Sequence, residues 1–138
     1  MIHVVTERRM LGGVRIWLAL AALNGLMAVA AGAFGAHAVG DPQAKEWLRT
    51  GALYQLTHAV AALACYGLLR AYVGPAVWAA WLFTLGALVF AGSLYLMAAT
   101  GVRALGAVTP IGGVLLLLGW AALVYGALAG MLVRPPGP

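Results

Sequence analysis

Charged residues and cysteine are both scarce in this chain of 138 residues. Lys, Arg, Asp and Glu together make up only 8% of it, whereas soluble domains carry about 25% charged residues. A water-facing surface of ordinary composition is therefore excluded. The single cysteine, Cys65, has no partner for an internal disulfide and excludes a metal cluster with several cysteine ligands. The eight basic residues are scattered along the chain, which argues against a nucleic-acid partner.

Long apolar runs fill most of the remaining sequence. Hydrophobic residues make up 64% of the chain, and four runs cover roughly residues 16–36, 52–71, 75–99 and 109–133. Each run reaches the ~20 residues that are needed to cross ~30 Å of hydrocarbon at ~1.5 Å per residue. We therefore expect an all-α integral membrane four-helix bundle, up-down-up-down, in a single transmembrane domain over residues 16–133.

The ends of the chain are polar and short. Residues 1–15 form a polar leader and residues 134–138 form a tail. The basic residues before the first run could also belong to a signal peptide. The apolar run is longer than most signal-peptide cores, so we expect a retained membrane span.

Two Pro-containing pairs predict where helices begin. Asp41 before Pro42, and Thr109 before Pro110, are typical of an N-cap followed by the first helical residue. The mixed apolar and charged pattern over residues 41–49 predicts a short interfacial helix after the first span. The alternative for that segment is a solvated loop.

Basic residues weakly favour one orientation. With four spans both termini lie on the same side of the membrane, and that side carries five of the eight basic residues. Positively charged loops are retained in the cytoplasm. We therefore expect both termini to be cytoplasmic.

Small residues recur at helical spacing in the first and last runs. Such residues let membrane helices approach closely. The seams they predict could lie within one chain or between copies, so a homo-oligomer or a larger membrane complex is an expected possibility. The predicted packing residues are Gly25, Ala28, Gly32, Gly35, Gly112, Gly119, Gly126 and Gly130.

Polar side chains collect at the membrane face opposite the termini. A polar ring inside a span is costly unless it meets a partner or a water-filled cavity. We predict a polar pocket at this face, in which an imidazole could change charge or an arginine could hold an anion. Its predicted ligand-binding residues are His37, Tyr54, Gln55, His58, Ser93, Tyr95, Arg103 and Thr109.

A structural role for the same side chains is the main alternative. His58 could bond a backbone carbonyl or Ser93 and hold two helices together, while His37 could cap the first helix. The other half of the bundle is expected to be nearly dry, with Asn24 as its main polar group.

The sequence contains no pattern typical of an enzyme. It lacks the HExxH, GxSxG and GxxxxGK[ST] motifs. Its three acids, Glu7, Asp41 and Glu46, all lie outside the four runs, so paired carboxylates are missing from the spans. Two histidines also make a poor structural zinc site, which usually takes four protein ligands. We therefore expect no catalytic residues, no bound metal and no cofactor.

Four sequence blocks resemble one known family. Gly32–His37 reads GAFGAH, Tyr54–Ala59 fits YQxxHA, Phe90–Tyr95 ends in GSLY, and Thr109–Gly113 reads TPIGG. In this order the blocks are similar to the signature of domain-of-unknown-function family 423, small bacterial membrane proteins. The resemblance runs from about residue 16 to residue 133. It implies a four-span protein of the inner (plasma) membrane and no agreed activity.

Two functions therefore stay open. The first is binding or passage of a small polar solute, an ion or a lipid headgroup at the His-containing end. The second is a structural or accessory subunit of a larger membrane complex, in which the polar residues only hold helices together.

Overall fold

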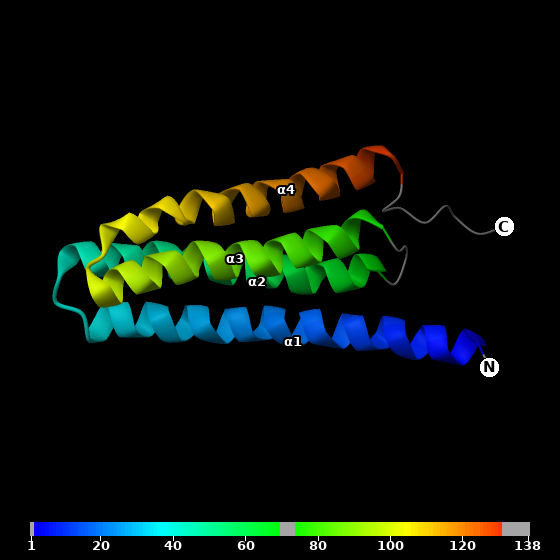
Figure 1. The fold of residues 1–138 in the computed structure, drawn as a ribbon, viewed down its shortest axis with the longest axis horizontal. Coiled ribbons are helices and arrows are strands. Elements are labelled where there is room, and N and C mark those ends of the chain that lie inside the picture. The colour runs from blue at the N-terminus through cyan, green and yellow to red at the C-terminus, as the bar shows by residue number, and fades with distance from the viewer. Residues whose placement is uncertain (1, 70–73, 131–138) are drawn as a thin grey trace.

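The four apolar runs fold as long helices that alternate in direction. The computed structural model describes residues 2–69 and 74–130, with the side chains of residues 15–68 and 74–130. Both connections seen at one end, residues 38–41 and 101–108, lie opposite the N-terminal end of the first helix (Figure 1). The elements are α1 (Ile2–His37), α2 (Pro42–Leu69), α3 (Pro75–Thr100), the 3-10 helix η1 (Arg103–Ala107) and α4 (Thr109–Leu128).

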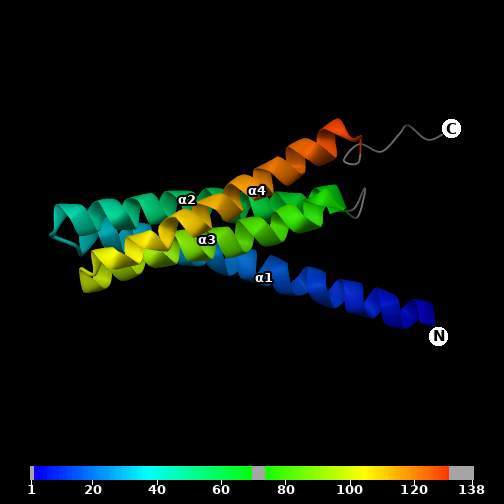
Figure 2. The same cartoon turned by 45° about the horizontal axis from the view of Figure 1, so that its top comes forward.

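The helices pack as a bundle in chain order. α2 packs against α1 and α3, and α3 packs against both α2 and α4. α4 follows η1, packs against α3 and diverges from it toward its own C-terminal end (Figure 2). The all-α bundle that the sequence predicts is therefore confirmed.

Local signals set several helix ends. The backbone N–H of Ala44 donates to Asp41 Oδ2 at 2.7 Å, so Asp41 caps α2 as predicted. α3 ends at Thr100 and is capped by Gly101, whose φ of 72° is easily reached without a Cβ atom. Its N–H donates to the Met97 carbonyl at 2.9 Å.

Several predicted boundaries differ from the structure. α1 begins at Ile2, so the segment expected as a leader before residue 16 is continuous with the first span. No proline interrupts it, and Gly12-Gly13 only lower helix propensity by about 1 kcal/mol each. α2 runs unbroken from Pro42, so the interfacial helix expected at 41–49 is the first part of α2.

The start and end of α4 also differ from the expectation. Thr109 lies within α4 and gives no capping bond; the residue before the helix is Val108. α4 ends at Leu128, although the span was expected to continue to residue 133. Residues 131–138, which include the expected tail, lie outside the described part of the chain.

Three segments are long and apolar enough to cross a membrane. Within the described residues these are Arg15–His37, Pro75–Thr100 and Arg103–Leu128. α2 does not meet that criterion. It carries Lys45, Glu46 and Arg49 near its start, and polar side chains further along. That α2 also crosses the bilayer stays a prediction.

The buried core consists mainly of small side chains around two large rings. Trp17 of α1 and Phe83 of α3 are both fully buried. Alanine side chains let the backbones of α2 and α3 come close, which increases van der Waals contact between membrane helices. The other members are Ala21, Ala62, Cys65, Ala76, Ala79, Ala80, Ala87 and Leu116.

Most of the predicted packing residues lie at helix contacts. A Cβ at Gly35 would lie 2.9 Å from Leu48 Cβ, and one at Gly119 would lie 2.6 Å from the Phe83 ring. Gly25 and Gly32 face Ala59 and Ala52 across α1 and α2. Ala28, Gly112 and Gly126 are buried.

Gly130 is the exception among the predicted packing residues. It follows the end of α4 with a φ of 68°, and nothing lies within 4 Å of a Cβ placed there. Its N–H donates to the Ala127 carbonyl at 3.1 Å. Gly130 therefore follows the end of α4, and the described residues form no helix contact at it, so the packing role expected of Gly130 is not seen among them.

Candidate functional site

Gln55 is the centre of a chain of side-chain hydrogen bonds that joins three helices. It is fully buried, and its Nε2 donates to Asn24 Oδ1 of α1 at 2.8 Å. The Tyr95 hydroxyl of α3 donates to Gln55 Oε1 at 2.8 Å. Asn24 Nδ2 in turn donates to the Leu20 carbonyl at 3.0 Å and, at 3.4 Å, to the Thr84 carbonyl. The amides of Gln55 and Asn24 are thus used to connect α1, α2 and α3.

A glycine makes room for this arrangement. A Cβ at Gly51 would lie 2.6 Å from Cε1 of Tyr95. Only a residue without a side chain lets the Tyr95 ring pass over α2 and reach Gln55. Gly51 was not among the predicted packing residues, because it stands alone rather than in a repeating small-residue pattern.

His58 has both ring nitrogens engaged. Nδ1 lies 2.7 Å from the Tyr54 carbonyl, which can only accept, so Nδ1 carries the proton. The indole N–H of Trp120 in α4 donates to Nε2 at 3.1 Å. These two bonds require the neutral ring in one tautomer, because an indole nitrogen can only donate. His58 therefore joins α2 to α4.

Aromatic rings surround His58. Its ring centroid lies 5.5 Å from that of Phe83, 6.2 Å from that of Trp120 and 6.1 Å from that of Tyr54. Tyr54 also stacks on Phe90 with 4.7 Å between centroids. The imidazole is buried at 7% exposure among apolar ring surfaces.

Ser93 and Thr109 form a separate contact between α3 and the start of α4. The Ser93 hydroxyl donates to the Phe90 carbonyl at 2.8 Å. A hydroxyl has one proton, so Thr109 Oγ1 donates to Ser93 Oγ across 2.7 Å. Ser93 therefore does not bond His58.

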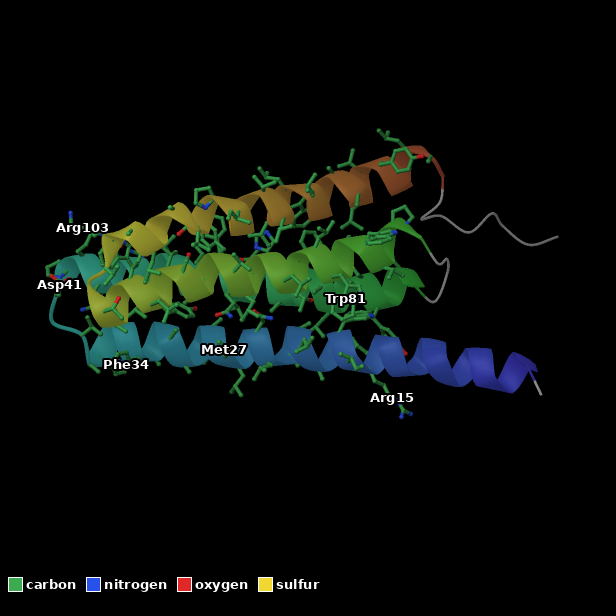
Figure 3. The ribbon with its side chains drawn as sticks, viewed as in Figure 1. Arg15, Met27, Phe34, Asp41, Trp81 and Arg103 are labelled. Carbon is green, nitrogen blue, oxygen red and sulfur yellow. The ribbon has the colours of Figure 1, made fainter. Side chains whose placement is uncertain are left out.

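His37 and Arg103 lie apart from the other predicted site residues. Both are exposed at the end of the bundle opposite the N-terminus, and Arg103 projects away from the helices (Figure 3). His58 lies sixteen residues into α2, or about 24 Å from the helix start at 1.5 Å per residue. The structure does not bring the two predicted imidazoles into one pocket.

Asn24 is the partner of Gln55 that sequence reasoning missed. We expected it in the dry half of the bundle, yet it bonds Gln55. The side-chain chemistry of Asn24, and not its position in the sequence, could have predicted this bond. Asn24 is the only asparagine in the chain, and a primary amide inside a span needs a polar partner.

An open groove lies beside His58, between α2 and α4. Its volume is ≈550 Å³. Every side-chain N or O atom that is fully buried in the described residues has a hydrogen-bond partner. No group of three His, Cys, Asp or Glu residues that could hold a metal gathers there or elsewhere in that part of the chain. The groove is lined by Tyr54, His58, Phe90, Pro110, Gly113, Val114, Leu116, Leu117 and Trp120.

Curated bacterial membrane proteins are similar to this chain over most of its length. A "UPF0382 membrane protein" of Staphylococcus epidermidis is 42% identical over 118 residues, covering 83% of this chain and 96% of the relative. "UPF0382 membrane protein YwdK" of Bacillus subtilis is 35% identical over 120 residues, covering 83% and 97%. "UPF0382 inner membrane protein YgdD" of Escherichia coli K12 is 37% identical over 120 residues, covering 83% and 90%.

A family pattern gives the same assignment. Residues 31–113 match the family described as "Protein of unknown function (DUF423)". This stretch contains the four blocks singled out in the sequence, from Gly32–His37 to Thr109–Gly113. No solved structure matches the chain. The chain is therefore a membrane protein that belongs to domain-of-unknown-function family 423.

Proposed function

We propose that the protein binds a lipophilic molecule from the bilayer in the groove beside His58. The groove itself carries the proposal. Its volume of ≈550 Å³ is within the range of about 300–1,000 Å³ that is typical of small-molecule sites, which are mostly apolar and often lie between the helices of bundles. The groove contains His58, which was among the predicted site residues. The proposed ligand, however, is a lipophilic molecule and not the small polar solute, ion or lipid headgroup expected from the sequence.

The hydrogen bonds favour a ligand with a largely apolar body. Gln55 and His58, which were predicted to hold a small polar solute or an ion, both bond other helices. The Tyr54 hydroxyl is a polar group of the lining for which the described residues provide no partner. A ligand with one small polar end could hydrogen-bond there, while the Phe90 and Trp120 rings contact its apolar body.

The groove is open on the outer surface of the bundle. Tyr54, Val114, Leu117 and Trp120 are 44%, 53%, 69% and 45% exposed, respectively. These residues lie on the outer side of α2 and α4. A molecule dissolved in the bilayer can therefore enter sideways without opening the core.

A photoreactive fatty acid tests the proposal. The purified protein in lipid nanodiscs is labelled with a diazirine fatty acid, and the labelled residues are located by mass spectrometry. We expect saturable labelling at the α2–α4 groove that unlabelled oleic acid displaces. Val114→Phe fills the groove and should abolish this labelling. Val124→Phe adds the same ring at a similarly exposed position of α4 outside the groove lining and should leave it unchanged.

Labelling that never saturates, or that is equal in the two variants, contradicts the proposal. It would mean that the fatty acid meets this surface only as bulk lipid. Melting temperatures of both variants verify that the bundle is intact.

The accessory-subunit function is the second candidate. The hydrogen bonds of Gln55 and His58 favour it, because both side chains already bond other helices of the bundle and so hold the helices together. In that case the groove receives a helix of another membrane protein. A photo-crosslinking residue at Leu117 should then give one protein adduct in native membranes that is lost when the residue is moved to Val124. Crosslinks to lipid alone contradict this second function.

A further inference from the structure

A second groove lies between the end of α1 and the start of α2, away from His58. Its volume is ≈370 Å³, and it is lined by Gly32, Gly35, Ala36, Lys45, Arg49 and Ala52. The helices approach closely here, since a Cβ at Gly32 would lie 3.6 Å from Ala52 Cβ. The floor of the groove therefore consists of backbone and methyl groups.

Two cations lie at the edge of this floor. Lys45 and Arg49 are four residues apart on α2, so they lie on the same face of the helix. Arg49 Nη1 is 4.0 Å from Glu46 Oε2, and the two side chains are 81% and 61% exposed. An ion pair so long and so exposed is weak. Asp41 is already engaged as the α2 N-cap.

The groove is at the level expected for lipid headgroups. Lys45 and Arg49 lie about 5 and 10 Å from the start of α2 at 1.5 Å per residue. Asp41 and Phe34 lie near this same end of the bundle (Figure 3). Leu53 is 62% exposed and lies four residues after Arg49, on the same face of α2, so it offers apolar surface for acyl chains next to the cations. A free anion would gain nothing from that apolar surface. A phospholipid would contact the cations with its headgroup and the apolar surface with its acyl chains.

We propose that this groove binds the phosphodiester headgroup of an anionic phospholipid. Arg49 supplies a planar fork that matches two phosphate oxygens, and Lys45 supplies a second positive charge. The small residues Gly32, Gly35 and Ala36 leave the space in which the headgroup lies. The site is independent of the His58 groove, because the two linings share no residue.

Lipid retention measured by native mass spectrometry tests the site. Phosphatidylglycerol is titrated into the full-length protein in detergent, with phosphatidylcholine as the zwitterionic comparison. Arg49→Gln should weaken phosphatidylglycerol binding about fivefold. Arg103→Gln removes the same charge from an exposed position at the same end and should leave the affinity within about twofold.

Two further variants act on the groove in opposite directions. Ala36→Leu fills the floor without changing charge and should weaken binding. Glu46→Gln removes the competing carboxylate and should tighten it. If Arg49→Gln lowers the melting temperature, Arg49→Lys, which keeps the charge but not the fork, should retain the fold and bind phosphatidylglycerol more tightly than Arg49→Gln.

Three results would overturn the lipid site. The first is an equal loss of phosphatidylglycerol in Arg49→Gln and Arg103→Gln, which would indicate only general attraction to the surface. The second is phosphatidylcholine retained as tightly as phosphatidylglycerol. The third is displacement by inorganic phosphate at millimolar concentration, which would assign the site to a free anion.

Discussion

Gln55 shows how one buried side chain can hold three helices. Its amide accepts from Tyr95 and donates to Asn24, so Gln55→Leu leaves the buried Asn24 oxygen and the partly buried Tyr95 hydroxyl without these partners. We expect Gln55→Leu to lower the free energy of unfolding by about 1–3 kcal/mol. Denaturant unfolding in mixed micelles measures this free energy.

Thr57→Val is the control, because it removes an exposed hydroxyl that bonds its own helix. Its free energy of unfolding should be within about 0.5 kcal/mol of wild type.

A stable Gln55→Leu variant would count against the hydrogen-bonded chain. It would mean that the amide reaches water or lipid headgroups in the membrane. The Tyr95 hydroxyl would then have no structural role either.

Trp120 connects α4 to α2 through one indole proton. Trp120→Phe keeps an aromatic ring but leaves His58 Nε2 without a donor. We expect a loss of about 1 kcal/mol in unfolding free energy. Trp78→Phe changes a 70% exposed ring and should have no measurable effect. Equal unfolding curves for the two variants would show that the bond between His58 and Trp120 does not contribute.

Residue type was easier to predict than residue depth. The sequence singled out Gln55, His58, Ser93, Tyr95 and Thr109, and the structure places all of them in interhelical hydrogen bonds. The predicted positions of Gln55 and His58 along the bundle axis were wrong for a simple reason. The start of the second helix was taken from the apolar run, which begins at residue 52, whereas α2 begins at Pro42.

That offset explains the missed partner. Ten additional residues move Gln55 about 15 Å farther from the helix start. The displacement brings Gln55 to the level of Asn24 and separates His58 from His37. Sequence periodicity tells which residues share a face but not how far one helix is shifted along another.

At the scale of the element, close contact between α3 and α4 depends on Gly112. A Cβ at this position would lie 2.7 Å from Phe90 Cα and also too close to the Phe90 backbone nitrogen. Backbone atoms cannot move aside without separating the helices. We expect Gly112→Ala to lower the unfolding free energy by about 1–3 kcal/mol, measured by thermal unfolding in detergent.

The neighbouring glycine provides the control. At Gly113 the nearest atom to a Cβ is Phe90 Cδ2 at 4.0 Å, an ordinary contact. Gly113→Ala should be neutral or slightly stabilising, because alanine favours a helix by up to about 1 kcal/mol. The account of α3–α4 packing is wrong if the two adjacent variants unfold alike.

Helix existence was predictable from the sequence, but helix ends were only partly so. Asp41 and Pro42 correctly predicted a helix start because their chemistry is local, although the helix that begins there is α2 itself and not a separate interfacial helix. The analogous Thr109 pair did not act as a cap, because the Ser93 hydroxyl of another helix is the partner of Thr109. Gly130 likewise matched a packing motif, yet its backbone conformation ends α4.

For the whole molecule, we predict that α2 crosses the bilayer together with the other three helices. α2 runs antiparallel to α1 and α3 along their length (Figures 1 and 2). If it spans, cysteines introduced at Gly40 and Arg103 label from one side, and a cysteine at Gly74 labels from the other. The charge pattern predicts that Gly74 is cytoplasmic. These single-cysteine variants are made in a Cys65→Ala background, and whole cells are labelled with a membrane-impermeant maleimide. Labelling of residues 40 and 74 from the same side contradicts a four-span topology.

Histidine NMR shows directly whether a lipophilic molecule binds beside His58. The ¹⁵N-histidine protein is studied in nanodiscs while oleic acid is added. We predict that His58 is protonated at Nδ1 and not at Nε2, and that its ring signals shift saturably. The exposed His37 should not respond, since it lies outside the groove lining. The opposite tautomer at His58, or shifts at His37 without shifts at His58, would contradict the account.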